Sequence, residues 1–178
     1  LDSTDRDTFT PVSASDGTDY LVVWKAAQNY PGSVVGRKTP YNLLAARISG
    51  TTGEWIDKKP TKIAEVEEYY TKATNYGNPI RPAVAFGGGH FLVVWNETDA
   101  LYEGATEELR ARRIGTDGQP MGVEFTLHAV TNEFHFAPHV TFDGHDFVMT
   151  YSSSSNLLEH KVRGARLGTT GTSPTLFA

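Results

Sequence analysis

One supersecondary unit occurs three times along this 178-residue chain, and the repetition is the strongest constraint on its fold. Each copy is predicted to contain a strand led by a proline, a tight turn and a second, almost continuously apolar strand. The copies begin at Pro11, Pro82 and Pro138. The first two end in Leu-Val-Val-Trp, at Trp24 and Trp95, whereas the third has Val-Met-Thr-Tyr.

Each copy continues into a third strand, at 43–48, 109–114 and 162–167, and then a Gly-Thr-x-Gly turn. A fourth strand is clearest at 123–127, and we expect its counterparts near 61–64 and 174–178. Arg47, Arg113 and Arg166 recur at one position of the third strand, which predicts that they bridge neighbouring units. The glutamate-rich segment 64–73 is predicted to be a short helix between the first two copies.

Three four-stranded antiparallel repeats fit two all-β architectures, a β-propeller in which each repeat is a blade and a β-trefoil. The propeller is favoured because the repeats are longer than trefoil repeats and the Gln-x-Trp signature of ricin-type trefoils is absent. We expect one domain, 1–178, with blades at about 8–73, 74–134 and 135–178.

The proline-led strand, the Asp-Gly turn, Leu-Val-Val-Trp, the Ala-Arg-Ile strand and Gly-Thr-x-Gly resemble the blade repeat of a broad group of bacterial β-propeller proteins, most of them secreted. The resemblance covers nearly the whole chain. It implies blade architecture and a secreted or cell-surface location, and it implies no particular activity.

Three blades are too few to close a propeller, which typically has about four to eight. The first expectation is therefore a second chain, as a homodimer that forms a six-bladed ring with twofold symmetry. The alternative is that the chain is part of a longer propeller.

Composition excludes several other classes of protein. The net charge is −5 without a basic stripe, which disfavours a nucleic-acid partner. No apolar run approaches the roughly 18 residues of a membrane span. Cysteine is absent, so disulfides and cysteine nucleophiles are excluded. We expect no cofactor and no metal, since the blade layout separates His135, His139 and His145.

In a propeller, the connections from strand two to three and from strand four to the next blade emerge at one end. These connections are long and variable here, which predicts a ligand-binding surface at that end. Tyrosine and arginine suit such a surface because they combine contact area with polar groups. The candidate ligand-binding residues are Tyr30, Arg37, Lys38, Tyr69, Tyr70, Tyr76 and Arg81, together with His139 in the central channel.

The favoured function is a non-catalytic binding or scaffold module that recognises a protein or a glycan through this end. The competing hypothesis is a hydrolase, cleaving glycans or esters in the central channel of the assembled ring. No Gly-x-Ser-x-Gly motif is present, and nothing in the sequence singles out a carboxylate pair, so no catalytic residue is assigned.

Overall fold

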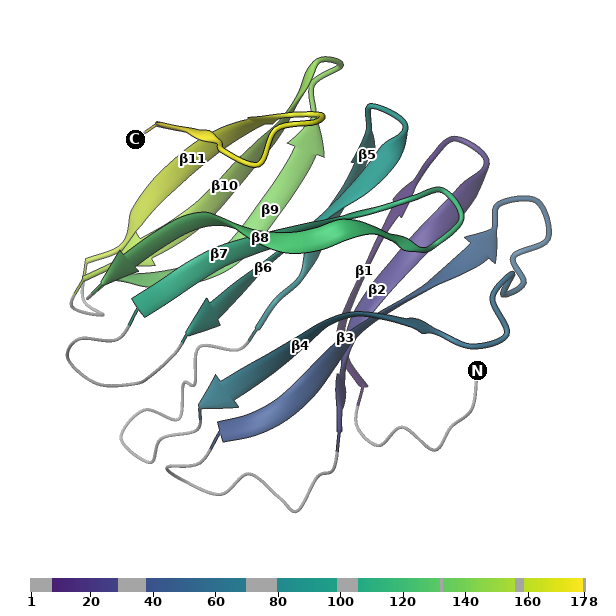
Figure 1. Ribbon diagram of the computed structural model, residues 1–178, viewed down its shortest axis with the longest axis horizontal. Helices are drawn as coiled ribbons and strands as arrows, with labels where there is room; N and C mark the ends of the chain where they lie inside the picture. The colour runs from purple at the N-terminus through teal and green to yellow at the C-terminus, as the bar shows by residue number, and fades with distance from the viewer. Residues whose placement is uncertain are drawn as a thin grey trace.

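A computed structural model describes residues 8–28, 38–69, 80–98, 106–131, 133–155 and 159–177. These residues form three separate four-stranded antiparallel sheets, each with its strands in chain order (Figure 1). The first comprises β1 (Thr8–Ser15), β2 (Asp19–Ala27), β3 (Lys38–Ser49) and β4 (Thr61–Tyr69); the second, β5 (Ala83–Gly87), β6 (His90–Thr98), β7 (Thr106–Ile114) and β8 (Pro120–Thr131); the third, β9 (Phe134–Phe142), β10 (Asp146–Ser154), β11 (Lys161–Gly168) and β12 (Thr175–Phe177).

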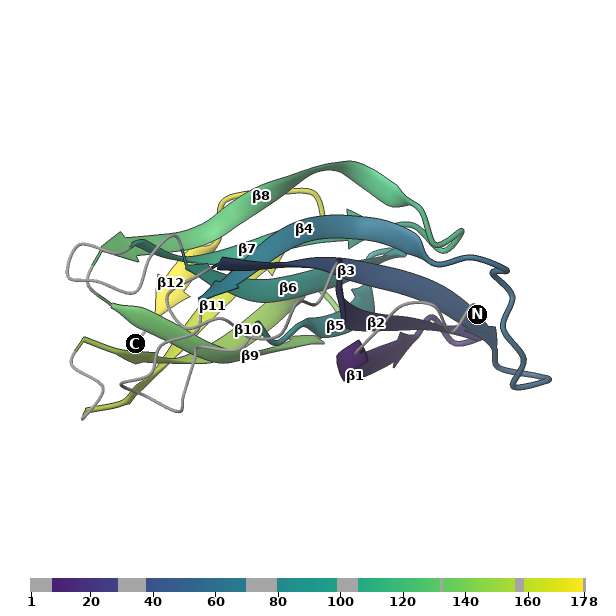
Figure 2. The same cartoon turned by 90° about the horizontal axis from the view of Figure 1, so that it is seen from below.

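The sheets are arranged as the blades of a propeller. Their first strands lie together, with β1 beside β5 and β5 beside β9. Figure 2 shows β1, β5 and β9 along one side of the molecule, and β4 and β8 along the opposite side. The fold is therefore all-β and propeller-like, with three antiparallel blades, and it is not the trefoil alternative. We call the sheets blades one, two and three.

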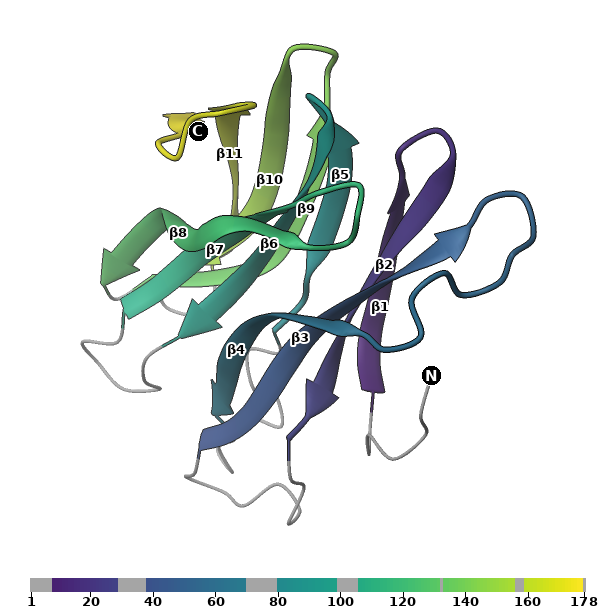
Figure 3. The same ribbon diagram turned by 45° about the vertical axis from the view of Figure 1, so that its right-hand side comes forward.

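The hairpins between first and second strands all lie at one end of the blades (Figure 3). In blade one, Asp16 Oδ1 accepts the backbone N–H groups of Thr18 and Asp19, both at 2.8 Å. Gly17 supplies the positive φ of 97° that this turn requires. Asp143 and Gly144 repeat the arrangement in blade three. These Asp-Gly pairs therefore serve the turns.

Most of the hydrophobic core lies between blades, with one cluster for each neighbouring pair, and a smaller third cluster of Trp24, Ala26, Leu44 and Ala46 lies within blade one. Between blades one and two, Leu21 and Val23 of β2 pack with Val93 and Trp95 of β6. Between blades two and three, the cluster includes Leu92, Val94, Phe147, Met149 and Leu167. Both faces of β6 are buried in this way, which explains its nearly continuous apolar sequence.

Two of the three recurring arginines, Arg47 and Arg113, bridge blades as the sequence predicted, whereas Arg166 pairs with Asp143 and Asp146 of its own blade. Arg47 Nη1 donates to the carbonyl of Thr116, 3.2 Å away in blade two. Arg113 Nε donates to the carbonyl of Thr169, 2.8 Å away in blade three. Thr116 and Thr169 occupy the same position of their Gly-Thr-x-Gly turns, so the same contact is made at both interfaces.

The prediction of a helix at 64–73 is wrong for residues 64–69, which the structure describes. Residues 64–69 belong to β4, where Val66 pairs with Tyr41 and Glu68 with Thr39 of β3. The side chains of Ile63 and Val66 are buried in the core between blades, whereas Glu65 is exposed. Pairing with β3 and this burial outweigh the helix propensity of the segment. Residues 70–73 lie outside the described part of the chain.

The first strands of blades one and three begin earlier than predicted. Pro11 and Pro138 lie inside β1 and β9, next to breaks in strand register where Thr10 and Ala137 have φ of 51° and 45°. A bulge accommodates proline because the ladder hydrogen bond is already interrupted there. His135 and His139 consequently both belong to β9. Pro82, in contrast, directly precedes β5 as expected.

Within the described residues, no helix is long and apolar enough to cross a membrane.

The close approach of β5 to β9 predicts the effect of adding one methyl group. A Cβ on Gly87 would lie 2.2 Å from the ring of Phe142. We expect Gly87→Ala to lower the free energy of unfolding by about 1–3 kcal/mol through overpacking, measured by urea denaturation. Gly171 has no atom within 4 Å of the same position, so Gly171→Ala is the control and should change stability by less than about 0.5 kcal/mol. Equal effects would contradict the close packing of these strands.

Candidate functional site

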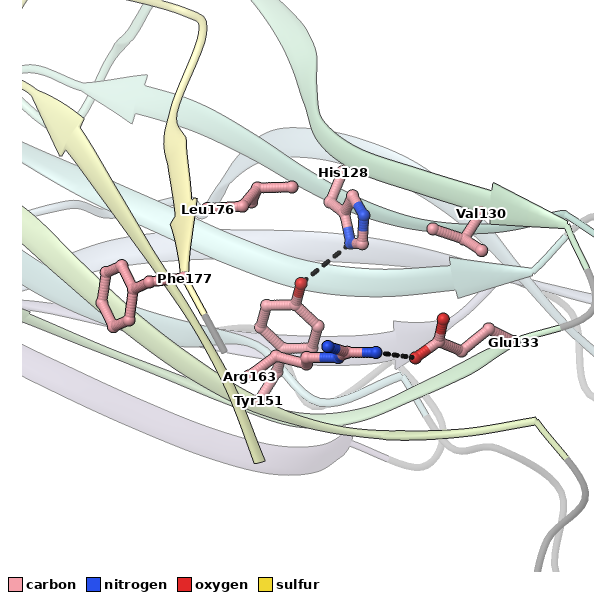
Figure 4. A pocket seen from close by; sticks show the side chains of 7 residues that line it. All are labelled: His128, Val130, Glu133, Tyr151, Arg163, Leu176 and Phe177. Atoms are coloured by element: carbon pink, nitrogen blue, oxygen red, sulfur yellow. Dashed lines mark hydrogen bonds and ion pairs between the residues drawn. The ribbon is translucent and has the colours of Figure 1, made fainter. Parts of the chain in front are cut away.

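A cavity of about 320 Å³ opens between blades two and three (Figure 4). It lies where β8 ends and β9 begins, and where β10 ends and β11 begins. This is the end at which the sequence predicted a binding surface. Five structural elements contribute its seven lining residues, which are His128, Val130, Glu133, Tyr151, Arg163, Leu176 and Phe177.

A hydrogen bond between His128 and Tyr151 spans the floor of the cavity. Tyr151 Oη lies 2.8 Å from His128 Nδ1, and Figure 4 shows the two side chains meeting from opposite blades. Burial lowers the pKa of His128 and raises that of Tyr151. Both groups are therefore neutral at physiological pH.

Glu133 and Arg163 form the charged wall of the cavity. Arg163 Nη2 lies 3.5 Å from Glu133 Oε1, and Arg163 Nε donates to Ser153 Oγ at 3.2 Å. A hydrogen bond from Ser153 lowers the pKa of Glu133, and the charge of Arg163 lowers it further. Glu133 is therefore ionised, and its charge offsets that of Arg163.

His135 lies behind this cluster and is fully buried. Its ring stacks on His128 with centroids 5.0 Å apart and meets the edge of Tyr151 at 5.1 Å. Burial is the main cause that lowers the pKa of His135 to about 4, and His128 adds to the effect. His135 therefore remains neutral well below the usual pKa of histidine.

Two departures from the repeat create the cavity. Tyr151 stands where blade two has Trp95, which is fully buried. His128 stands where blade one has Ala64, since Leu43 pairs with Ala64 and its counterpart Leu109 pairs with His128. At the interface of blades two and three, hydrogen-bonding rings thus replace the tryptophan and the alanine that belong to the core of the first interface.

The corresponding end of the first interface is occupied by an ion pair. Lys25 is buried and bonds to Glu68, and its Nζ lies 4.4 Å from the centroid of the Tyr41 ring. Glu68 also accepts the backbone N–H of Ile80 at 2.7 Å. These four residues hold the start of blade two against blade one.

Among the residues predicted from the sequence to bind ligand, only Arg81 and His139 have described side chains, and neither is among the described residues that line the cavity. Tyr30, Arg37, Tyr70 and Tyr76 lie outside the described residues. Lys38 and Tyr69 pair with each other at the ends of β3 and β4. Arg81 is exposed, and its backbone N–H donates to Asn96 Oδ1 at 3.1 Å. His139 is exposed on β9 opposite Thr150.

Sequence reasoning missed His128, Glu133, Tyr151 and Arg163. One signal was visible, because Tyr151 breaks the Leu-Val-Val-Trp pattern of the other repeats. The described residues hold no cluster of three or more histidine and acidic side chains arranged to bind a metal ion.

Burial of His135 predicts a loss of stability in acid. Its pKa is about 4 in the folded chain and about 6.5 when exposed, so the unfolded chain binds more protons between these values. The free energy of unfolding should therefore fall as the pH drops from about 6.5 to about 4, by on the order of 3 kcal/mol from this residue.

Urea denaturation at a series of pH values tests this. His135→Gln should flatten the pH dependence, whereas His139→Gln, at an exposed position of the same strand, should leave it unchanged. If the free energy of unfolding depends on pH in the His135→Gln protein as it does in the unchanged protein, His135 does not titrate as described.

No protein-family model matches the sequence, and no curated protein is significantly similar to it. Among solved structures, an exo-1,5-α-L-arabinanase from a bovine ruminal metagenomic library matches with 10% identity and a TM-score of 0.48, over 98% of this chain and 79% of that chain. The α-L-arabinanase of Cellvibrio cellulosa, complexed with arabinohexaose, matches with 10% identity and a TM-score of 0.47, over 98% of this chain and 78% of that chain. Identities and TM-scores this low support no inference about activity, and the fold assignment rests on the strand topology.

Proposed function

We propose that this chain is a non-catalytic binding module that recognises a glycan through the cavity between blades two and three. The observation that carries the proposal is the composition of the cavity wall. Apolar groups come from Leu176 and Val130, and hydrogen-bonding groups come from His128, Glu133 and Arg163.

This combination suits a sugar. A sugar ring presents C–H groups on its faces and hydroxyl groups around its edge. Leu176 and Val130 offer apolar contact to a face, Arg163 donates hydrogen bonds and the Glu133 carboxylate accepts them. Because the Glu133 and Arg163 charges offset each other, an uncharged ligand is favoured over an anion. The volume is near the lower limit of small-molecule sites, which suits the end of a glycan better than a folded protein surface.

The same residues disfavour the competing hydrolase hypothesis. Hydrolysis of a glycoside ordinarily requires two carboxyl groups, one of them protonated. Glu133 is the only carboxylate among the described lining residues, and its lowered pKa keeps it ionised. The first strands of the blades, β1, β5 and β9, would line a central channel, and they contain no aspartate or glutamate.

Calorimetric titration with neutral and acidic oligosaccharides of two to six units tests the proposal. We expect binding to a neutral glycan, and Arg163→Met should weaken it about 10- to 100-fold, because a hydrogen bond from a charged group is worth about 1.5–3 kcal/mol. Arg81→Met is the matched control, at an exposed arginine outside the cavity, and should bind like the unchanged protein.

Three outcomes would contradict the proposal. The first is the absence of binding to every glycan in the panel, and the second is equal binding by the unchanged protein and the Arg163 variant. The third is the release of shorter sugars during incubation, which would favour the hydrolase.

A further inference from the structure

Each blade presents two faces, and only some of them are covered within the described chain. The first face, toward the preceding blade, carries Phe91, Val93 and Trp95 in blade two. The second face, toward the following blade, carries Leu92 and Val94. In both interfaces the second face of one blade covers the first face of the next. Among the described residues, no sheet covers the first face of blade one or the second face of blade three.

The first face of blade one is built like a blade interface. Tyr20, Val22 and Trp24 stand at the positions of Phe91, Val93 and Trp95. Trp24, Leu44 and Ala46 form a buried cluster on this face. Tyr20 is 45% exposed, however, whereas Phe91 is 1% exposed.

Trp55 enlarges this aromatic surface. It packs edge-on against Trp24, with centroids 6.2 Å apart, and is 43% exposed. Large aromatic side chains of this kind are enriched where proteins bind one another.

The second face of blade three carries the complementary features. Val148, Thr150 and Val162 stand at the positions of Leu92, Val94 and Leu109 in blade two, and Val162 is 74% exposed. Phe177 lies over Gly164 on this face.

Arg166 is the third arginine of the bridging series. Arg47 and Arg113 reach the threonine carbonyl of the next blade's Gly-Thr turn. Arg166 lies at the same position, but its side chain is 51% exposed, and its ion pairs are with Asp143 and Asp146 of its own blade, at 3.0 and 3.5 Å. Blade one contains the matching turn, Gly50-Thr51-Thr52-Gly53.

We propose that the second face of blade three binds the first face of blade one in a second copy of this chain. Twofold symmetry makes this contact twice and closes a ring of six blades. At each contact Arg166 donates to the carbonyls of the Gly50–Gly53 turn of the other copy, repeating the contacts of Arg47 and Arg113.

A second copy is the favoured occupant because both halves of the interface are encoded in one chain. The aromatic face and the Gly-Thr turn are on blade one, and the arginine that recognises such turns is on blade three. The new interface is more polar than those within the chain, since Thr150 replaces the valine of blades one and two. Association should therefore be reversible on dilution.

Sedimentation analysis over a range of concentrations tests the ring. We expect a species of twice the 19.5 kDa chain mass that dissociates on dilution. Val162→Asp, which places a charge in the interface, and Arg166→Glu should each weaken association at least about tenfold. Val123→Asp is the matched control, because Val123 is 81% exposed on β8 of blade two and lies on neither of the two faces proposed to meet. Circular dichroism of each variant checks that the fold is retained.

Mixing two variants distinguishes this ring from other dimers. Tyr20→Arg alters the first face of blade one and should also weaken association. A mixture of the Tyr20→Arg and Val162→Asp proteins can form a heterodimer with one fully intact contact, so association should recover in the mixture. A dimer in which like faces meet would show no such recovery.

A monomer at all concentrations, an open polymer, or a dimer insensitive to both variants would each overturn the proposal. The glycan cavity lies wholly within one chain, so its binding can be measured separately on the Val162→Asp protein. Failure of the ring and failure of the proposed function are therefore distinguishable.

Discussion

Face-to-face packing of blades is the interaction on which the rest of this structure depends. A four-stranded sheet with apolar side chains on both faces cannot bury them alone, so each blade relies on its neighbours for its core. Trp95 is fully buried at such an interface. Truncating a buried ring of this size costs about 3–5 kcal/mol, a large part of the 5–15 kcal/mol that stabilises a typical domain. The residues that recur in the repeats are therefore mainly those that pack one blade against the next.

The bridging arginines show how one contact is kept while its surroundings change. Arg47 is held by an ion pair with Asp57, in which Nη2 lies 2.7 Å from Oδ1. The hydrogen bond from Arg47 lowers the pKa of Asp57. Arg113 has a different setting, above the ring of Phe125 at 5.0 Å and beside His90 Nε2 at 3.2 Å. Both still reach the Gly-Thr turn of the next blade. Both arginines donate hydrogen bonds to carbonyl groups of a turn at the edge of the next blade. The residues that hold each guanidinium in place differ between the two blades.

These differences explain what the sequence could and could not predict. The strands and their order followed from alternation and turn residues, because each repeat carries the same local signals. The segment 64–69 was misassigned because its glutamates favour a helix locally, whereas Ile63 and Val66 are held by contacts with distant residues. The cavity was missed because it joins His128 of blade two to Tyr151 of blade three. Their proximity depends on strand register across a bulge, which no local pattern encodes.

Blade three departs from the repeat on both faces, and packing alone does not account for this. On its first face Tyr151 replaces tryptophan, and the smaller ring leaves space lined by polar groups. On its second face Thr150 replaces valine and is exposed. The two faces meet at β12, a three-residue strand paired only with β11. Leu176 and Phe177 both line the cavity, and the ring of Phe177 also lies over Gly164. The pairing of β12 with β11 therefore positions both side chains.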